Sequence, residues 1–228
     1  HEANFTNTKG ENPKFSFSLI KGALFSETKF TQPEFINSVL TSSLAVDSTL
    51  ASGWFNGALL ENFSCINSDL SGSVFSDCTG RRVTLVGVKP EDADFSNCEL
   101  TQLSTLNDVC LDRSKFKNAD LSEANFRGAS LIDTDFSGGK LIKTDFSETN
   151  LSGAVMVRAF ARESRFHRAQ ILHADLSEAD FMNGNFLLAS IKNCKVDNAN
   201  FFSADFMKAE LDYVNFDKAN VKRTKLKI

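Results

Sequence analysis

The 228-residue chain has almost no aromatic side chains with a polar group, because it contains one Tyr and one Trp against 22 Phe. Three Pro and 12 Gly are too few for a collagen-like or proline-rich disordered chain. No apolar run approaches the roughly 18 to 20 residues of a membrane-spanning helix, which excludes a helical membrane protein. Hydrophobic residues make up 42% of the chain, enough for a core, so we expect a folded, soluble protein. Because the Phe ring forms no conventional hydrogen bonds, its excess predicts many equivalent, fully buried ring positions.

Charge and cysteine content exclude further classes of protein. A net charge of -4 with 24% charged residues argues against a basic protein that binds nucleic acid directly. The five cysteines are odd in number and form no CxxC pair, which argues against a disulfide framework or a zinc site: Cys65, Cys78, Cys98, Cys110 and Cys194. We therefore expect buried, reduced thiols, and neither a metal nor a cofactor.

The start of the chain bears on its location. No charged-then-apolar leader is present, which together with reduced thiols favours the cytoplasm. His1 directly before Glu2 is typical of the remainder of an expression tag, so it stays open whether the chain is a piece of a longer protein with its own targeting signal.

A large apolar residue recurs at every fifth position. From Leu111 the sequence divides into the blocks LDRSK, FKNAD, LSEAN, FRGAS, LIDTD, FSGGK, LIKTD and FSETN, and the frame holds to Leu226. A small residue stands two positions before nearly every large one. The same frame runs from Phe5 to Leu100, and we place one extra residue between Leu100 and Leu106, which we take as the next large residue of the frame, a block centre. A period of five fits neither a helix nor a flat strand, so the chain must turn after each short extended piece.

The chemistry of the block centres repeats at every fourth block. One column is aliphatic: Leu111, Leu131, Leu151, Ile171, Ile191 and Leu211. A second is Phe at seven successive levels and then continues with Met156, Leu176, Val196 and Phe216: Phe15, Phe35, Phe55, Phe75, Phe95, Phe116 and Phe136. A third is Phe at five successive levels: Phe126, Phe146, Phe166, Phe186 and Phe206. Stacked coils of four blocks explain this sorting, whereas a plain period of five does not. The sequence therefore predicts a single domain over 1–228, made of about eleven four-sided coils of roughly 20 residues each.

The pattern A(D/N)(L/F), with two further residues completing each block, resembles the pentapeptide-repeat family over essentially the whole chain. The resemblance implies an all-β fold, a right-handed quadrilateral β-helix. In that fold the block centre and the small residue two before it point inward, and the other three residues point outward. The resemblance implies little about function, because members of the family have very different roles.

Three places depart from the regular frame. Between Cys78 and Cys110, Gly80, Pro90 and the extra residue interrupt it, and charged residues crowd there: Arg81, Arg82, Glu91, Asp92 and Asp94. We predict an irregular coil there that can bulge out as a specific loop, with a degenerate repeat of no function as an equal alternative. The large and small residues are exchanged at Phe63 and Cys65, and a ring stands beside an undersized centre at Phe160 and Ala161. We interpret both as local repacking of the interior.

No catalytic constellation is recognisable. His167 and His173 lie in different blocks, and we interpret both as surface residues. A cluster of four arginines suggests a phosphate or nucleic-acid patch: Arg158, Arg162, Arg165 and Arg168. The four-block period favours ion pairs between coils instead, because Glu178, Asp145 and Glu148 lie one coil away from Arg158, Arg165 and Arg168.

One set of outward positions in the C-terminal third is apolar and forms a candidate contact patch: Met182, Leu187, Leu188, Phe202 and Met207. Met182 and Phe202 are four blocks apart, as are Leu187 and Met207, so each pair should stack on the surface. Neighbouring exposed apolar columns are typical of a contact surface. Cover by a terminal segment or a loop is the alternative.

These observations favour a non-enzymatic interaction or scaffold module that binds unknown protein partners through the side faces of a rod. The alternative comes from the resemblance: some pentapeptide-repeat proteins mimic duplex DNA, bind type II topoisomerases such as DNA gyrase and affect quinolone sensitivity. Residues 1–110 hold 7 Lys and Arg against 13 Asp and Glu, whereas residues 111–228 hold 18 against 16. This uneven charge imitates regular phosphates poorly. An end-to-end homodimer is possible.

Overall fold

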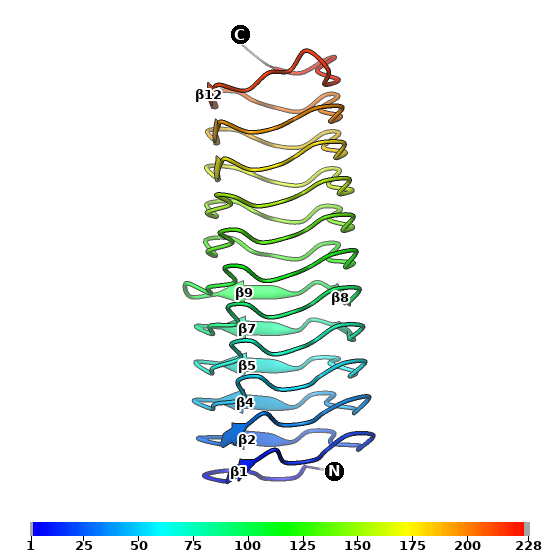
Figure 1. The fold of residues 1–228 in the computed structure, drawn as a ribbon, viewed down its shortest axis with the longest axis vertical. Helices are drawn as coiled ribbons and strands as arrows, with labels where there is room; N and C mark the ends of the chain where they lie inside the picture. Colours follow the sequence, from blue (N-terminus) through cyan, green and yellow to red (C-terminus); the bar gives the residue numbers. More distant parts are fainter. Residues whose placement is uncertain (1, 226–228) are drawn as a thin grey trace.

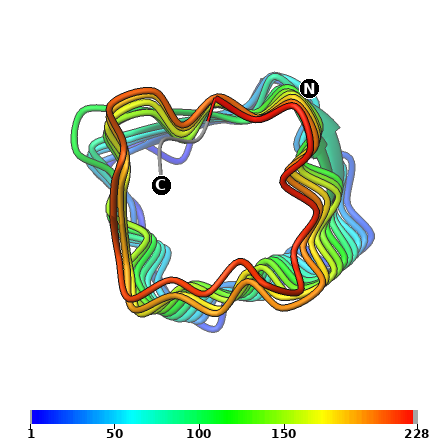
Figure 2. The ribbon, with the colours of Figure 1, turned by 90° about the horizontal axis from the view of Figure 1, so that it is seen from above.

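The computed structural model describes residues 2–225, which form a four-sided rod, seen from the side in Figure 1 and along its axis in Figure 2. Parallel bridges join residues one turn apart, from Asn4↔Leu24 to Asn200↔Asn220. One ladder has ten levels: Lys14, Glu34, Trp54, Val74, Asp94, Lys115, Asp135, Val155, Asp175 and Lys195. The predicted all-β solenoid with about 20 residues per coil is therefore confirmed, with about ten turns where eleven were expected.

We number the four sides of the rod in chain order from residue 3. Side 1 holds one five-stranded parallel sheet made of β2 (Leu24–Ser26), β4 (Leu44–Val46), β5 (Ser64–Ile66), β7 (Thr84–Val86) and β9 (Ser104–Leu106). Side 2 holds β1 (Lys9–Glu11) with β3 (Lys29–Thr31), and β10 (Gln170–Leu172), β11 (Ser190–Lys192) and β12 (Glu210–Asp212). Side 3 consists of isolated bridges, including the ten-level ladder, and side 4 holds β6 (Thr79–Arg81) and β8 (Glu99–Thr101).

The repeated Asp or Asn before the block centre shapes the turn that follows it. The side chain of Asp145 accepts a hydrogen bond of 2.9 Å from the backbone N–H of Ser147, and Asp94, Asp120 and Asp135 bind the residue two further on in the same way. The residue after this N–H donor commonly adopts the left-handed conformation, for example Glu148 after Ser147, with φ of 62°. Short polar side chains stabilise such turns locally and tolerate this conformation, which explains why Asp and Asn recur.

The block centres stack inside the rod as ordered columns of rings. On side 3 the ring centroids of Phe55 and Phe75 are 4.5 Å apart at 9°, and those of Phe75 and Phe95 are 4.8 Å apart at 5°. Rings from side 1 meet this column edge-on, as Phe126 does with Phe116 at 74°. The only Trp and the only Tyr, Trp54 and Tyr213, lie on the outside, 47% and 89% exposed. The aromatic rings of the interior are thus all Phe, as the composition indicates, whereas the buried polar side chains are small Ser and Thr.

The extra residue lies later in the chain than the sequence suggested. β9 pairs with β7 in unbroken register, Leu85 with Thr105 and Val86 with Leu106, so Thr105 is the buried block centre. Our placement of Leu106 at a block centre is wrong, because its side chain is 47% exposed. Asn107 and Asp108 both have positive φ, and this widened corner is the green loop that projects from the outline in Figure 2.

Gly80 and Pro90 do not interrupt the rod. Gly80 pairs with Leu100 between β6 and β8, and bridges continue through Asp69↔Lys89 on the level of Pro90. The irregular stretch anticipated over 78–110 therefore narrows to the corner at Asn107 and Asp108.

The two places with an unusual arrangement of large and small residues, at 63–65 and 160–161, differ in how their side chains are placed. Phe63 and Cys65 are both buried, as expected for a swap of large and small residues. Phe160 does not repack the interior: its side chain is 56% exposed while Ala161 is buried at the centre. The reason is the backbone ladder, because Lys140↔Phe160 and Phe160↔Asp180 are bridges that fix residue 160 in an outward position.

The five cysteines are free thiols, and all except Cys110 are buried. Burial raises the pKa of the Cys65 thiol to about 12 and that of Cys110 to about 11. Because the thiolate is the reactive form, we expect fewer than one thiol per chain to react with Ellman's reagent within minutes at pH 8. All five should react in denaturant. Rapid reaction of two or more thiols in the native protein would contradict the burial described here.

Candidate functional site

The predicted contact patch lies on two adjoining sides of the rod. Met182 and Phe202 follow block centres of side 4, whereas Leu187, Leu188 and Met207 follow block centres of side 1. Leu188 and Met207 are 39% and 47% exposed, and the other three are half-buried.

Part of this patch is covered by a cation. The Arg223 guanidinium carbon lies 5.4 Å from the centroid of the Phe202 ring, close enough for a cation–π interaction. The exposed apolar surface of the patch is therefore concentrated at Leu188 and Met207, on side 1.

The arginine cluster forms ion pairs between coils. Arg158 binds Glu178 at 2.7 Å and Arg165 binds Asp145 at 3.1 Å, as predicted. The predicted pair of Arg168 with Glu148 does not form, because Glu148 binds Arg127 of the preceding coil at 2.7 Å. Arg162, for which no partner was expected, binds Asp180 at 2.5 Å. Three of the four guanidinium groups are thus neutralised on the rod itself.

The charged residues of the predicted irregular loop separate onto different sides. On side 4, Arg82 binds Glu61 at 3.1 Å, and the backbone N–H of Arg81 donates to the same carboxylate at 2.9 Å. On side 2, Glu91 and Asp92 share the guanidinium of Arg113, at 3.2 and 2.8 Å.

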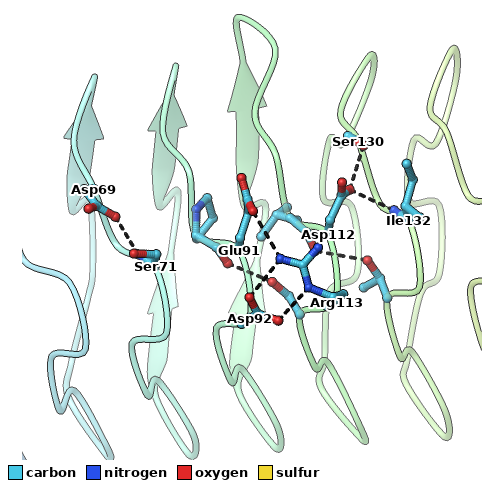
Figure 3. A network of polar contacts seen from close by, with 12 residues as sticks. Asp69, Ser71, Glu91, Asp92, Asp112, Arg113, Ser130 and Ile132 are labelled. Atoms are coloured by element: carbon cyan, nitrogen blue, oxygen red, sulfur yellow. Dashed lines mark hydrogen bonds and ion pairs between the residues drawn. The ribbon is translucent and has the colours of Figure 1, made fainter.

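Figure 3 shows Arg113 between these two acids, beside Asp112, which accepts hydrogen bonds from Ser130 and the backbone N–H of Ile132. The hydrogen bond from Arg113 lowers the pKa of Asp92. The network joins successive coils, so the four predicted residues form two separate interstrand clusters rather than one loop.

A shallow groove of about 300 Å³ opens on side 4 where Gly80 occupies a block centre. A Cβ atom on Gly80 would lie 2.8 Å from the carbonyl carbon of Leu60, so only glycine permits this close approach of the backbone. The groove is lined by Leu59, Glu61, Thr79, Gly80, Arg81, Glu99, Thr101 and Asp120.

The longest outward apolar column on the rod was not recognised from the sequence. In the five-stranded sheet of side 1, strand pairing places Val46, Ile66, Val86 and Leu106 at one outward position of four successive strands. We call these four residues the side-1 stripe. Leu24 and Leu44 lie on the same outer face, next to it. Comparing the residues directly after the block centres at every fourth block would have revealed the stripe.

Side chains that could hold a metal ion are not gathered in the described part of the chain. Between residues 2 and 225 no cluster of three or more His, Cys, Asp or Glu side chains has the arrangement of a metal site. His167 lies on side 1, whereas His173 lies on the corner after side 2. The same range contains no helix with the length and apolar character needed to cross a bilayer.

Comparison with solved structures finds similar folds at low sequence identity. HetL, a pentapeptide repeat protein involved in heterocyst differentiation regulation in the cyanobacterium Nostoc sp. strain PCC 7120, is 21% identical, with a TM-score of 0.38 over 98% of this chain and 89% of HetL. QnrB1, a plasmid-mediated fluoroquinolone resistance protein, is 24% identical, with a TM-score of 0.44 over 81% of this chain and 88% of QnrB1.

A third similar structure is a pentapeptide repeat protein from the thylakoid lumen of Arabidopsis thaliana. It is 20% identical, with a TM-score of 0.31 over 57% of this chain and 68% of that protein. A search of curated protein sequences finds no match.

The family model described as pentapeptide repeats matches this sequence in eight copies, over residues 110–147, 144–183 and 185–226. These residues make up just over half of the chain, and the four-sided solenoid continues with the same pattern through the remainder. The chain therefore belongs to the pentapeptide-repeat family.

Proposed function

We propose that this protein is a non-enzymatic interaction module whose partners bind the side faces of the rod. The observation that supports the proposal is that outward apolar side chains gather on the sides, exposed at Leu188 and Met207 in one region, and exposed at Leu106 and half-buried along the rest of the side-1 stripe in another. Outward apolar columns of this kind are typical of protein contact surfaces. The rod itself provides a rigid support, because every coil is bonded to the coils on either side.

The C-terminal patch is tested by exchanging Met182 and Phe202 for lysine. We expect M182K/F202K to reduce capture of a crosslinked cellular partner at least tenfold, because two charges would replace the apolar pair. Both positions point outward, so the melting temperature should change by less than about 3 °C. The readout is quantitative mass spectrometry of proteins crosslinked to the purified chain.

The matched control places the same charges at the equivalent positions of side 3, with S137K/S177K. Partner capture should persist in this variant. Equal loss in both variants would mean that charge alone weakens binding, and unchanged capture by M182K/F202K would remove the side-4 part of the patch, Met182 and Phe202, from the interface. If the wild-type chain captures no partner saturably, the interaction proposal fails.

A DNA mimic that binds a type II topoisomerase is the second candidate. The rod shape and the net charge of -6 over residues 1–110 favour it. Neutralising ion pairs oppose it, such as Asp120 with Lys140 at 2.8 Å and Asp205 with Lys225 at 2.9 Å. Adding the protein to a DNA gyrase supercoiling reaction distinguishes the candidates, because a mimic inhibits or alters supercoiling at micromolar concentration and a side-face module for other partners does not.

Two further expectations accompany the proposal. Five free, mostly buried thiols suit a reducing compartment such as the cytoplasm. An end-to-end homodimer stays a prediction: it would bury Leu211, Phe216 and Val221, which are only partly buried near the C-terminal end of the described rod.

A further inference from the structure

The outer face of the five-stranded sheet on side 1 is rich in apolar residues, as is typical of a sheet face that another element covers. The inner face of this sheet packs into the core through Phe25, Ala45, Cys65, Leu85 and Thr105. The outer face presents the side-1 stripe with Leu24 and Leu44 beside it, and five of these six residues are half-buried while Leu106 is exposed. Apolar residues on both faces are typical of parallel sheets that other elements cover on both sides.

Within residues 2–225, the sheet with the most strands also lies on side 1. The strands β2, β4, β5, β7 and β9 lie one above another along the rod in Figure 1. The stripe ends at the projecting corner of Asn107 and Asp108, and on the next coil its position is taken by Arg127. The stripe is therefore limited to four successive coils, and the projecting corner lies at one end of it.

The corner that follows the stripe is mainly acidic. Glu27, Asp47 and Asp108 are exposed at the corner next to it, and none of the three forms an ion pair within residues 2–225. The side-1 segments on these levels contain no Lys or Arg, over residues 24–27, 44–47, 64–67, 84–87 and 104–108. Lys29 and Lys89 stand further along the same corner, at the start of side 2, so the edge keeps a net negative charge with three acids that form no ion pair.

The geometry points to a partner of defined chemistry: we infer that the side-1 stripe binds an amphipathic helix of a partner protein, with Lys or Arg along the edge that faces Glu27, Asp47 and Asp108. The inference rests on the proposed function and specifies its surface and partner. A helix is the usual cover for the apolar face of a sheet. Basic residues on one edge complement the acidic corner and fix the orientation of the helix.

The spacing of the stripe suits a helix that lies along the rod. Neighbouring strands are about 4.8 Å apart, so four stacked side chains extend over about 14 Å. Helix residues three and four apart rise about 4.5 to 6 Å, close to one strand spacing for each anchoring side chain. A hollow of about 150 Å³ at the adjacent corner, lined by Asn67, Ser68, Asp69, Gly87 and Lys89, leaves room for a longer side chain of the partner.

A pair of synthetic peptides tests the inference. The first is a labelled amphipathic helix of Leu, Ala and Lys with leucines at every third and fourth position, and the second replaces every Lys with Glu. We expect the Lys peptide to bind the full chain with a Kd in the micromolar range by fluorescence anisotropy, and the Glu peptide to bind at least tenfold more weakly. I66K/V86K should weaken binding of the Lys peptide at least tenfold.

The matched control is I36K/V157K, which adds the same charge at equivalent half-buried positions of side 3 and should change the Kd by less than twofold. If I66K/V86K does not fold, D47K/D108K leaves the stripe intact and reverses the charge of its edge. This variant should weaken the Lys peptide at least fivefold and strengthen the Glu peptide.

Equal binding of both peptides, or equal loss in the side-3 control, would overturn the inference. A chain whose I66K/V86K variant changes from dimer to monomer in sedimentation velocity would also overturn it, because the stripe would then be covered by a second copy. Partner capture that depends on Met182 and Phe202 while the peptide results are negative would sustain the proposed function and reject only this surface.

Discussion

Replacing Phe136 with alanine is expected to lower the free energy of unfolding by roughly 3 to 5 kcal/mol. The Phe136 ring is completely buried and stacks on Phe116 at a centroid distance of 5.2 Å and 8°. It also meets Phe126 and Phe146 edge-on, at 6.0 and 5.5 Å. Alanine would remove three aromatic contacts and leave a cavity that the hydrogen-bonded coils cannot close, because the strand spacing fixes their separation.

Urea unfolding followed by circular dichroism measures this loss. F136L should cost about 1 to 1.5 kcal/mol, because leucine occupies other block centres and fills most of the volume. F160A is the matched control: the Phe160 ring is 56% exposed, so its removal should change stability by less than about 1 kcal/mol. Similar losses for F136A and F160A would contradict the division into inward and outward positions.

Deleting Asp108 is expected to leave the rod folded, whereas deleting Glu123 should abolish cooperative folding. Without Asp108, Thr105, Leu106 and Asn107 are followed directly by Val109, which restores the regular block spacing found at Leu85 to Val88. Without Glu123, a regular corner loses a residue, and Ala124 and Phe126 of the next block no longer reach their inward positions. The expected loss exceeds about 4 kcal/mol, beyond that of most point substitutions.

Thermal unfolding and hydrogen exchange distinguish these outcomes. The melting temperature of the Asp108 deletion should lie within about 3 °C of the wild type, with amide protection retained in β7 and β9. The Glu123 deletion should lack the cooperative transition. If the Asp108 deletion unfolds the protein, the corner at 107–108 is not the inserted position.

The inward positions could be predicted because each block centre is chemically distinct from its neighbours and the columns repeat at every fourth block. The prediction was wrong where the larger of two neighbouring residues is not the one that the backbone register places inside. Leu106 is the larger apolar residue, yet Thr105 is inside, with its hydroxyl 3.1 Å from the carbonyl oxygen of Asn125. The ladder between β7 and β9 fixes the register, and exposing one leucine costs less than breaking several backbone hydrogen bonds.

The surface was less predictable, because the period identifies which residues are neighbours but not which of two neighbours forms the contact. Glu148 lies between Arg127 on one coil and Arg168 on the next, and it binds Arg127. The candidate patch at Met182 and Phe202 was found from pairs four blocks apart, but Arg223 stacks on Phe202 from one turn further on. Exposed contacts differ by less than about 1 kcal/mol, so composition alone does not rank them.

The coils repeat at a constant spacing, so the rod holds its surface features at fixed distances from one another. The side-1 stripe ends at Leu106 and the apolar residues Leu188 and Met207 lie several coils further along, joined by an uninterrupted ladder of backbone bonds. Inserting or removing one complete coil between them would change their separation by about 4.8 Å. A partner that binds both surfaces would therefore bind only rods with the matching number of coils between them. Such a partner would distinguish repeat proteins that share the same surface chemistry but differ in length.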